Sequence, residues 1–306
     1  MSLLERFFTG ERLELNERTR GDMQGRFVQL SDGITHYEIE GPRDGPLVVL
    51  IHGFSVPQFI WDPTFKALVV AGFRVLRYDL FGRGFSDRPH RTNNRDFFVR
   101  QLSELLDALA IQEPANLVSL SMGAVVAVEF ANRYPERVGT LSFIDPAGFD
   151  LELPCTVRLV FVPVIGEILL GMFNLLGTKA LLVSMLGDFY KPTQEALNAF
   201  VPRYQTQMLY RGFKRSLLST LRAGMLDEDL SPFRKLATSP IPIQLIWGWE
   251  DATVPYKHHK TFLQLLPQTE FHPIDQAGHI PHFERPDVVS PILVEFLQRY
   301  ITIMAR

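Results

Sequence analysis

The sequence contains little that would point to an oxidising compartment or to a polyanionic partner. Its 306 residues include one cysteine, Cys155, which cannot form a disulfide within the chain and fits a reducing compartment such as the cytoplasm. Charge is nearly balanced, with 31 Lys and Arg against 34 Asp and Glu, so the net charge is −3. This balance gives no electrostatic basis for binding nucleic acid.

Long uncharged apolar runs are also missing. The most apolar stretch, residues 154–187, is interrupted by Arg158, Glu167 and Lys179, whereas a membrane span needs roughly 18 uncharged residues. The first twenty residues contain charges of both signs and lack the apolar core of a secretory signal. We therefore expect a globular, cytoplasmic protein.

What the sequence does contain is a regular alternation of strand and helix patterns. Residues 47–51 (LVVLI) are apolar on both faces, as expected of a central parallel strand. Further strands are predicted at 26–30, 35–40, 73–79, 115–120, 138–145, 241–248 and 270–275. Helical patterns lie between or after them, at 57–71, 97–109, 122–134, 256–266 and 288–300. This alternation predicts an α/β fold in which helices flank a mostly parallel central sheet.

A long helical block interrupts the alternation. Residues 149–235 are rich in Leu, Phe and Met and contain no predicted strand. A block of this kind between two α/β stretches indicates a helical cap, or lid, inserted into one core made of residues 25–148 and 236–306. Residues 1–24 are charged and weakly periodic, and we expect them to form an N-terminal extension.

Ser121 lies where a predicted strand passes directly into a predicted helix, in the sequence SLSMGA. The residues two positions away, Ser119 and Gly123, are both small, as a sharp turn beneath an exposed side chain requires. The nucleophile elbow G-x-S-x-G has this property, although Ser119 replaces its first glycine. The sequence SLSMGA alone leaves two interpretations of Ser121 open, a catalytic nucleophile or a helix N-cap serine.

The sequence His52-Gly53-Phe54 ends the buried strand at 47–51. A glycine at this point lets the chain turn so that the next backbone N–H points into a crevice. The N–H groups of Phe54 and Met122 can then converge on one oxygen as an oxyanion hole. We expect His52 to brace the loop without transferring protons.

An acid and a base follow at the carboxyl ends of later predicted strands, where doubly wound sheets assemble their sites. Asp251 lies in a turn after one such strand, and His279 follows another. The order Ser121, Asp251, His279 is the order expected of this elbow type. In such a triad the imidazole removes the serine proton and the carboxylate fixes the ring tautomer. Asp145, which also ends a predicted strand, is the rival for the acid.

Other polar residues receive simpler interpretations. Glu250 is expected to face solvent, and surface or capping roles are expected for His258, His259 and His282. His272 is expected in the core or on the sheet surface. No spacing of His, Cys, Asp and Glu suggests a metal site, and no G-x-G-x-x-G follows the first strand.

Taken in order, these motifs resemble those of the α/β-hydrolase family, over about residues 25–304. They are HGF (52–54), DLFGRGFSDRP (79–89), SLSMGA (119–124), GWEDATVP (248–255) and GHIPHFERPD (278–287). The resemblance implies that Ser121 is the nucleophile, Asp251 the acid and His279 the base, with Phe54 and Met122 as oxyanion donors. It also implies a helical cap over the site and no cofactor.

The function expected from this resemblance is that of a serine esterase or lipase, a monoacylglycerol-type enzyme included. Its substrate would be a small carboxylic ester with a medium or long apolar acyl group, because residues 154–187 are apolar and ligand pockets are mostly apolar. Those residues could instead contact a membrane surface peripherally. The sequence leaves the oligomeric state open.

Two other functions remain open. One is hydrolysis of a carbon–carbon bond in ring-cleavage products with the same triad. It requires a cationic pocket for the substrate carboxylate, for which the candidates are Arg203, Arg211, Lys214 and Arg215, although a solvated helix face is the simpler role for them. The other is a hydrolase-like ligand receptor.

Overall fold

The computed structural model describes residues 10–151, 162, 165–166 and 185–304. Most of the apolar stretch 154–187 therefore lies outside the described residues, and so do Cys155 and the expectations of an acyl pocket or membrane contact built on that stretch. No helix among the described residues is long and apolar enough to cross a membrane.

Eight strands form one sheet in the order β1-β2-β4-β3-β5-β6-β7-β8. Their bounds are β1 Arg26–Leu30, β2 Gly33–Glu40, β3 Leu47–Ile51, β4 Arg74–Tyr78, β5 Ala115–Leu120, β6 Val138–Ile144, β7 Ile243–Gly248 and β8 Glu270–Ile274. The pairs β1–β2 and β2–β4 are antiparallel, and every other pair is parallel. This arrangement confirms the predicted α/β fold with a mostly parallel sheet.

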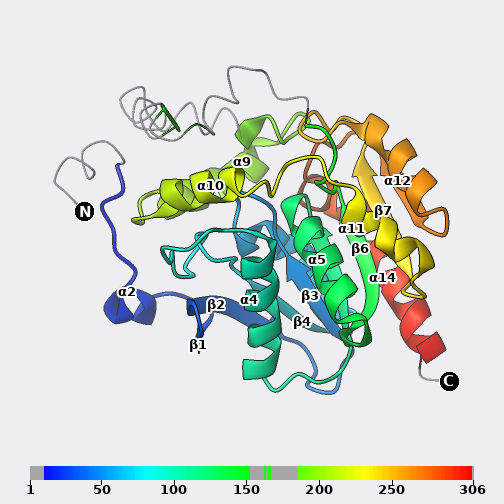
Figure 1. Ribbon diagram of the computed structural model, residues 1–306, viewed down its shortest axis with the longest axis horizontal. Helices are drawn as coiled ribbons and strands as arrows, with labels where there is room; N and C mark the ends of the chain where they lie inside the picture. The colour runs from blue at the N-terminus through cyan, green and yellow to red at the C-terminus, as the bar shows by residue number, and fades with distance from the viewer. Residues whose placement is uncertain (1–9, 152–161, 163–164, 167–184, 305–306) are drawn as a thin grey trace.

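Helices cover both faces of the sheet (Figure 1). One face packs against α4 and α5, and the other against α3 and α14. The longer core helices are α3 Asp62–Val70, α4 Arg95–Ala108, α5 Met122–Arg133, α12 His259–Leu265 and α14 Pro286–Met304. Shorter helices are α2 Glu17–Gly21, η1 Gln58–Trp61, η2 Pro135–Arg137, α11 Ser231–Lys235, η4 Leu236–Thr238, η5 Tyr256–His258 and α13 Pro281–Glu284.

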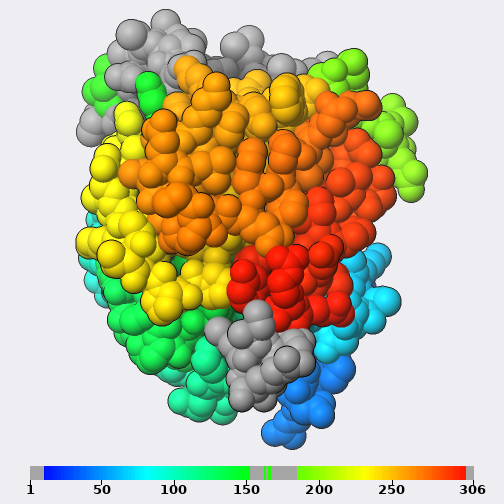
Figure 2. Space-filling model, turned by 90° about the vertical axis from the view of Figure 1, so that its right-hand side faces the viewer, coloured from blue at the N-terminus to red at the C-terminus, as the bar shows by residue number. Residues whose placement is uncertain are grey.

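Figure 2 shows the side of the molecule formed by the segments from β7 to α14, coloured yellow to red.

Strand β3 shows why the central strands are apolar throughout. Val49 and Ile51 pack into the core beneath α4 and α5, whereas Val48 and Leu50 pack into the core beneath α3 and α14. All four side chains are buried. Each buried side chain of this size stabilises the fold by about 1.5–3 kcal/mol, so a polar residue on either face would be costly.

Within the range 149–235, the described helices are α9 Gln194–Met208, α10 Phe213–Arg222 and α11. Helices α9 and α10 lie beyond the end of the sheet at which α5 begins (Figure 1). Helix α11 instead packs beside α5 and buries Phe233 in the core of the sheet face that α5 covers.

The N-terminal segment lies against α9 and α10. The backbone N–H groups of Arg12 and Leu13 both donate to the Leu209 carbonyl. The buried carboxylate of Glu11 accepts hydrogen bonds from the backbone N–H groups of Gly212, at 2.7 Å, and Lys214, at 2.8 Å. Because the N-cap of α10 is a glycine, Glu11 supplies the capping acceptor that this position lacks.

Loss of the Glu11 carboxylate at the N-terminus of α10 should lower the stability of the fold. Replacing Glu11 with alanine is expected to lower the free energy of unfolding by about 1–2 kcal/mol, measured by urea denaturation. Glu14→Ala is the control, because Glu14 pairs with Arg211 at the surface and such pairs contribute about 0–1 kcal/mol. Equal losses in the two variants would contradict the capping role.

Candidate active site

Ser121 occupies a sharp turn between β5 and α5. Its backbone has φ 51° and ψ −121°, a conformation that non-glycine residues rarely adopt and that costs about 1–3 kcal/mol. Three hydrogen bonds hold it there. Its N–H donates to the Ile144 carbonyl at 3.0 Å, and its carbonyl accepts from Ala124 at 2.9 Å and Ala147 at 3.0 Å. Ser121 is the N-cap residue of α5, but its side chain makes no capping hydrogen bond.

Glycines allow the turn to pack against the end of β3. A side chain at Gly123 would place its Cβ 2.4 Å from the Ile51 carbonyl oxygen and 2.7 Å from that of His52. A Cβ at Gly53 would lie 3.2 Å from the Cβ of Ser121. The loop after β3 therefore lies directly beside the serine.

Ser119 takes the position that is glycine in the elbow motif. It is fully buried, and its hydroxyl donates to the Ser142 carbonyl at 3.4 Å. The small hydroxyl thus finds an acceptor on the neighbouring strand, and the elbow forms without the first glycine.

The two expected oxyanion donors lie on the loop after β3, which holds Phe54, and at the start of α5, which is Met122. Among the described residues, neither the Phe54 nor the Met122 backbone N–H donates to a protein acceptor. His52 Nδ1 donates to the Gly53 carbonyl at 2.9 Å, and its Nε2 accepts from the Leu80 N–H at 2.9 Å. Burial lowers the pKa of His52 to about 4, so this histidine is neutral and braces the loop, as expected.

Asp251 and His279 form a buried pair. His279 Nδ1 lies 2.8 Å from Asp251 Oδ2. Asp251 Oδ1 accepts from the backbone N–H groups of Thr253, at 2.8 Å, and Val254, at 2.9 Å. The turn after β7 thus orients the carboxylate, and the carboxylate orients the imidazole.

The surrounding charges change the basicity of His279. Burial alone would lower its pKa, but the carboxylates of Asp251, Asp188 and Glu284 oppose burial and raise it above its ordinary value. Among the described residues no hydrogen bond joins Ser121 Oγ to His279. Bonds of this kind often tighten when a substrate is bound.

Two residues that are not among the predicted site residues, Glu284 and Asp188, hold the His279 loop. Glu284 does so through its carboxylate and Asp188 through its backbone carbonyl. The Glu284 carboxylate accepts from the Gly278 N–H at 2.8 Å and from the Tyr190 N–H at 2.6 Å. The backbone N–H of His279 donates to the backbone carbonyl of Asp188 at 2.8 Å. Burial raises the pKa of Glu284 to about 7. The one sequence signal for Glu284 is its place in the motif GHIPHFERPD.

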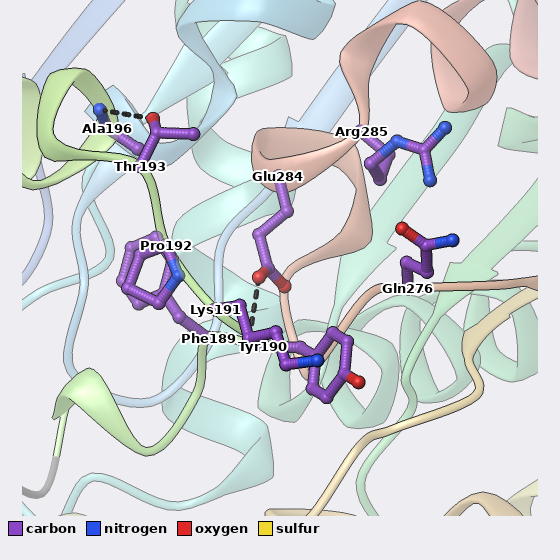
Figure 3. A pocket seen from close by; sticks show the side chains of 9 residues that line it. All are labelled: Phe189, Tyr190, Lys191, Pro192, Thr193, Ala196, Gln276, Glu284 and Arg285. Atoms are coloured by element: carbon purple, nitrogen blue, oxygen red, sulfur yellow. Dashed lines mark hydrogen bonds between the residues drawn. The ribbon is translucent and has the colours of Figure 1, made fainter.

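Glu284 also lines a cavity of about 460 Å³ on the outer side of this loop. Figure 3 shows the Glu284 carboxylate reaching the backbone of Tyr190. Arg285 and Gln276 also line the cavity. Glu250 likewise braces the loop, because its carboxylate accepts from the Ala277 N–H at 3.0 Å. The side chain of Glu250 is partly exposed, so it faces solvent in part, as expected, and also holds the loop.

Asp145, the rival acid, ends β6 but does not bond to His279. It is fully buried, and its Oδ1 accepts from the Gly248 N–H at 2.8 Å. One oxygen of Asp145, one of Asp251 and a ring nitrogen of His279 all lie within 4.8 Å of one another. Both acids thus lie beside the histidine, and Asp251 is the one that holds it.

Among the described residues, no other histidine hydrogen-bonds to this pair. The surface or capping role expected for His282 is wrong, because the separate short helix α13 directs its fully buried ring onto Trp61, 4.3 Å away between ring centroids. Burial lowers the pKa of His282 to about 3. His259 Nδ1 hydrogen-bonds to the Tyr256 carbonyl at the start of α12. His258 bonds to a backbone carbonyl, and His272 lies on the sheet surface beside Glu270.

The four cationic residues near α9 and α10 all have protein partners. Arg203 pairs with Asp62, and Arg211 pairs with Glu14. The remaining two are Lys214, which is buried, and Arg215, which is half-buried. Lys214 is 7% exposed, and Arg215 donates to the backbone carbonyls of Arg88 and Pro89.

Comparison with known proteins shows the family and the fold of the chain. The model of the alpha/beta hydrolase family matches residues 48–292. The chain belongs to this family. An esterase from Thermogutta terrifontis superimposes with a TM-score of 0.74 at 23% identity, covering 90% of this chain and 99% of that one, which shows a shared fold.

Two further proteins similar to this chain are named as a dienoate hydrolase and as a meta-cleavage product hydrolase. A 2-hydroxy-6-oxo-6-phenylhexa-2,4-dienoate hydrolase from Comamonas testosteroni is 28% identical over 88% of this chain and 93% of its own length. A meta-cleavage product hydrolase from Pseudomonas fluorescens IP01 is 27% identical with a TM-score of 0.69, covering 90% of this chain and 98% of that one.

The tight contact at Gly123 gives a test of the elbow. Gly123→Ala is expected to lower the free energy of unfolding by about 1–3 kcal/mol, because the new Cβ would overlap backbone atoms of β3. Gly21→Ala is the matched control, since nothing lies within 4 Å of a Cβ there. Denaturation curves that coincide for the two variants would contradict the close contact.

Proposed function

We propose that this hydrolase cleaves carboxylic esters with an apolar acyl group, through an acyl-enzyme on Ser121. The observation that carries the proposal is the strained Ser121 turn at the same sheet edge as the buried Asp251–His279 pair. A serine hydroxyl is a weak nucleophile at neutral pH, and it needs an oriented base to become reactive. The pair supplies that base.

In the proposed reaction, Ser121 Oγ attacks the ester carbonyl while His279 takes its proton. The N–H groups of Phe54 and Met122 bind the oxyanion, where one such donor typically contributes about 10²–10³ in kcat. His279 then protonates the leaving alcohol, and water hydrolyses the acyl-enzyme. Asp251 keeps the imidazole oriented and stabilises the imidazolium.

The choice of an ester is supported by the cations near α9 and α10. Cleavage of a carboxylate-bearing product would require a free cation, whereas Arg203 and Arg211 are paired with acids, Lys214 is buried and Arg215 is bonded to carbonyls. An ester with an apolar acyl group needs no such anchor. The proposed cap, residues 149–235, would supply the acyl pocket.

Carbon–carbon cleavage is the second candidate function. It is supported by the similarity to the dienoate hydrolase and the meta-cleavage product hydrolase, and by one residue, Arg83. Arg83 is fully buried, and its hydrogen bonds go to the carbonyls of Phe54 and Phe81 and to the Thr220 hydroxyl. Within the described part of the chain no carboxylate pairs with it. A substrate carboxylate could neutralise this charge, but α10, which holds Thr220, would have to move.

A panel of p-nitrophenyl esters of graded chain length separates the two functions. We expect turnover with a medium- or long-chain optimum, reduced at least about 10³-fold in Ser121→Ala and in His279→Ala. A 2-hydroxy-6-oxo-dienoate assayed beside the esters should be cleaved more slowly. Faster cleavage of the dienoate would favour the second candidate, and slow single-turnover chemistry with both would favour a ligand receptor.

A further inference from the structure

Two carboxyl groups lie together beside His279 where solvent does not reach them. Asp145 is fully buried and Asp251 is 5% exposed. They come from different strand ends, Asp145 after β6 and Asp251 after β7, and an oxygen of each lies within 4.8 Å of the other and of a His279 ring nitrogen. Two like charges this close in a dry site cannot both persist, so one carboxyl holds a proton.

The hydrogen-bond donors around the two groups decide where the proton resides. Asp251 accepts three bonds, from the N–H groups of Thr253 and Val254 and from His279 Nδ1. Asp145 accepts one, from the Gly248 N–H, and its Oδ2 is buried without any donor among the described residues. Donors stabilise the ionised form of a carboxyl, so Asp251 keeps the charge and Asp145 keeps the proton.

We propose that Asp145 is a positioning residue that remains a neutral acid and donates a hydrogen bond from Oδ2 to the Asp251 carboxylate. This bond gives Asp251 a fourth donor and fixes the rotamer in which it holds His279. The proton stays on Asp145 throughout. The same burial and the charge of Asp251 raise the pKa of Asp145 well above its ordinary value.

The backbone at this position suits an aspartate. Asp145 has φ 43°, in the left-handed region that Asp and Asn tolerate better than other non-glycine residues. Two residues later, the Ala147 N–H donates to the carbonyl of Ser121, so the same turn supports the nucleophile. Asparagine fits this backbone and can donate to Asp251, whereas glycine fits it and can donate nothing.

The first test is the titration of the His279 imidazole, followed by NMR. The charged or titratable groups that face this ring are Asp145, Asp188, Asp251, His282 and Glu284. Asp145→Asn replaces a neutral donor with a neutral donor, so the His279 midpoint should move by less than about half a pH unit. Asp251→Asn, the control, removes an ionised partner and should lower the midpoint by about 1–3 units.

An ionised Asp145 would give a different result. Asp145→Asn would then remove a negative charge, and the His279 midpoint would fall by an amount comparable to that in Asp251→Asn. That outcome would overturn the proposal. If Asp145→Asn does not fold, Asp145→Ser takes its place in the titration, because serine is also neutral and also has a hydrogen-bond donor. The same small shift of the His279 midpoint is expected.

The second test detects the proton directly. The infrared spectrum at pH 8, above the titration of Glu284, should contain the carbonyl band of a neutral carboxylic acid that is missing in Asp145→Asn. Identical spectra in this region would overturn the proposal. Neither test requires turnover, so both hold even if Ser121 is not the nucleophile.

The catalytic consequence rests on the proposed function. Asp145→Gly, which removes the donor without straining the backbone, should lower kcat/KM for the best ester about tenfold. Asp145→Asn should restore most of that loss. A glycine variant as active as wild type, or an asparagine variant that rescues nothing, would contradict the positioning role.

Discussion

The start of α5 rests directly on the carboxyl end of β3, because Gly123 has no side chain to hold the two apart. This contact forces the strained backbone of Ser121 and places the loop of Gly53 against it. The strain costs about 1–3 kcal/mol and is maintained by strands and helices whose buried side chains are mostly apolar. Both Ser121 and the N–H groups that we propose as oxyanion donors depend on this one close approach.

On the opposite side of the site, buried acids hold the histidine. Asp251 orients the ring of His279, while Glu284 and the Asp188 carbonyl fix the backbone beside it. Several carboxyl groups in one dry region repel one another, and the structure offsets this with backbone N–H donors and, in our proposal, with a proton on Asp145. The site is therefore a balance of buried charges as well as a catalytic geometry.

Much of the fold could be predicted from the sequence, because central strands buried on both faces have a distinctive composition. The segments 47–51 and 115–120 are strands with the predicted bounds. Ser121, Asp251 and His279 could be proposed as a triad for a similar reason, since each follows a strand at the same sheet edge. The choice between Asp145 and Asp251 could not be made this way, because both satisfy that condition and only the bond to His279 separates them.

The interpretation of His282 was wrong for a physical reason. Its sequence neighbourhood is typical of a surface residue, and it becomes buried only where a distant segment brings Trp61 against it. The hydrogen bond from the Ala277 N–H to the partly exposed Glu250 likewise joins distant segments. Approaches of this kind depend on the packed tertiary structure, which local patterns do not encode.

Covalent labelling with a fluorophosphonate, followed by peptide mapping, tests the central claim most directly. The account predicts one phosphonyl group per chain, attached to Ser121, with labelling slowed at least about 10³-fold in His279→Ala. An unlabelled protein, or a label on any other residue, would contradict the assignment of Ser121 as the activated nucleophile.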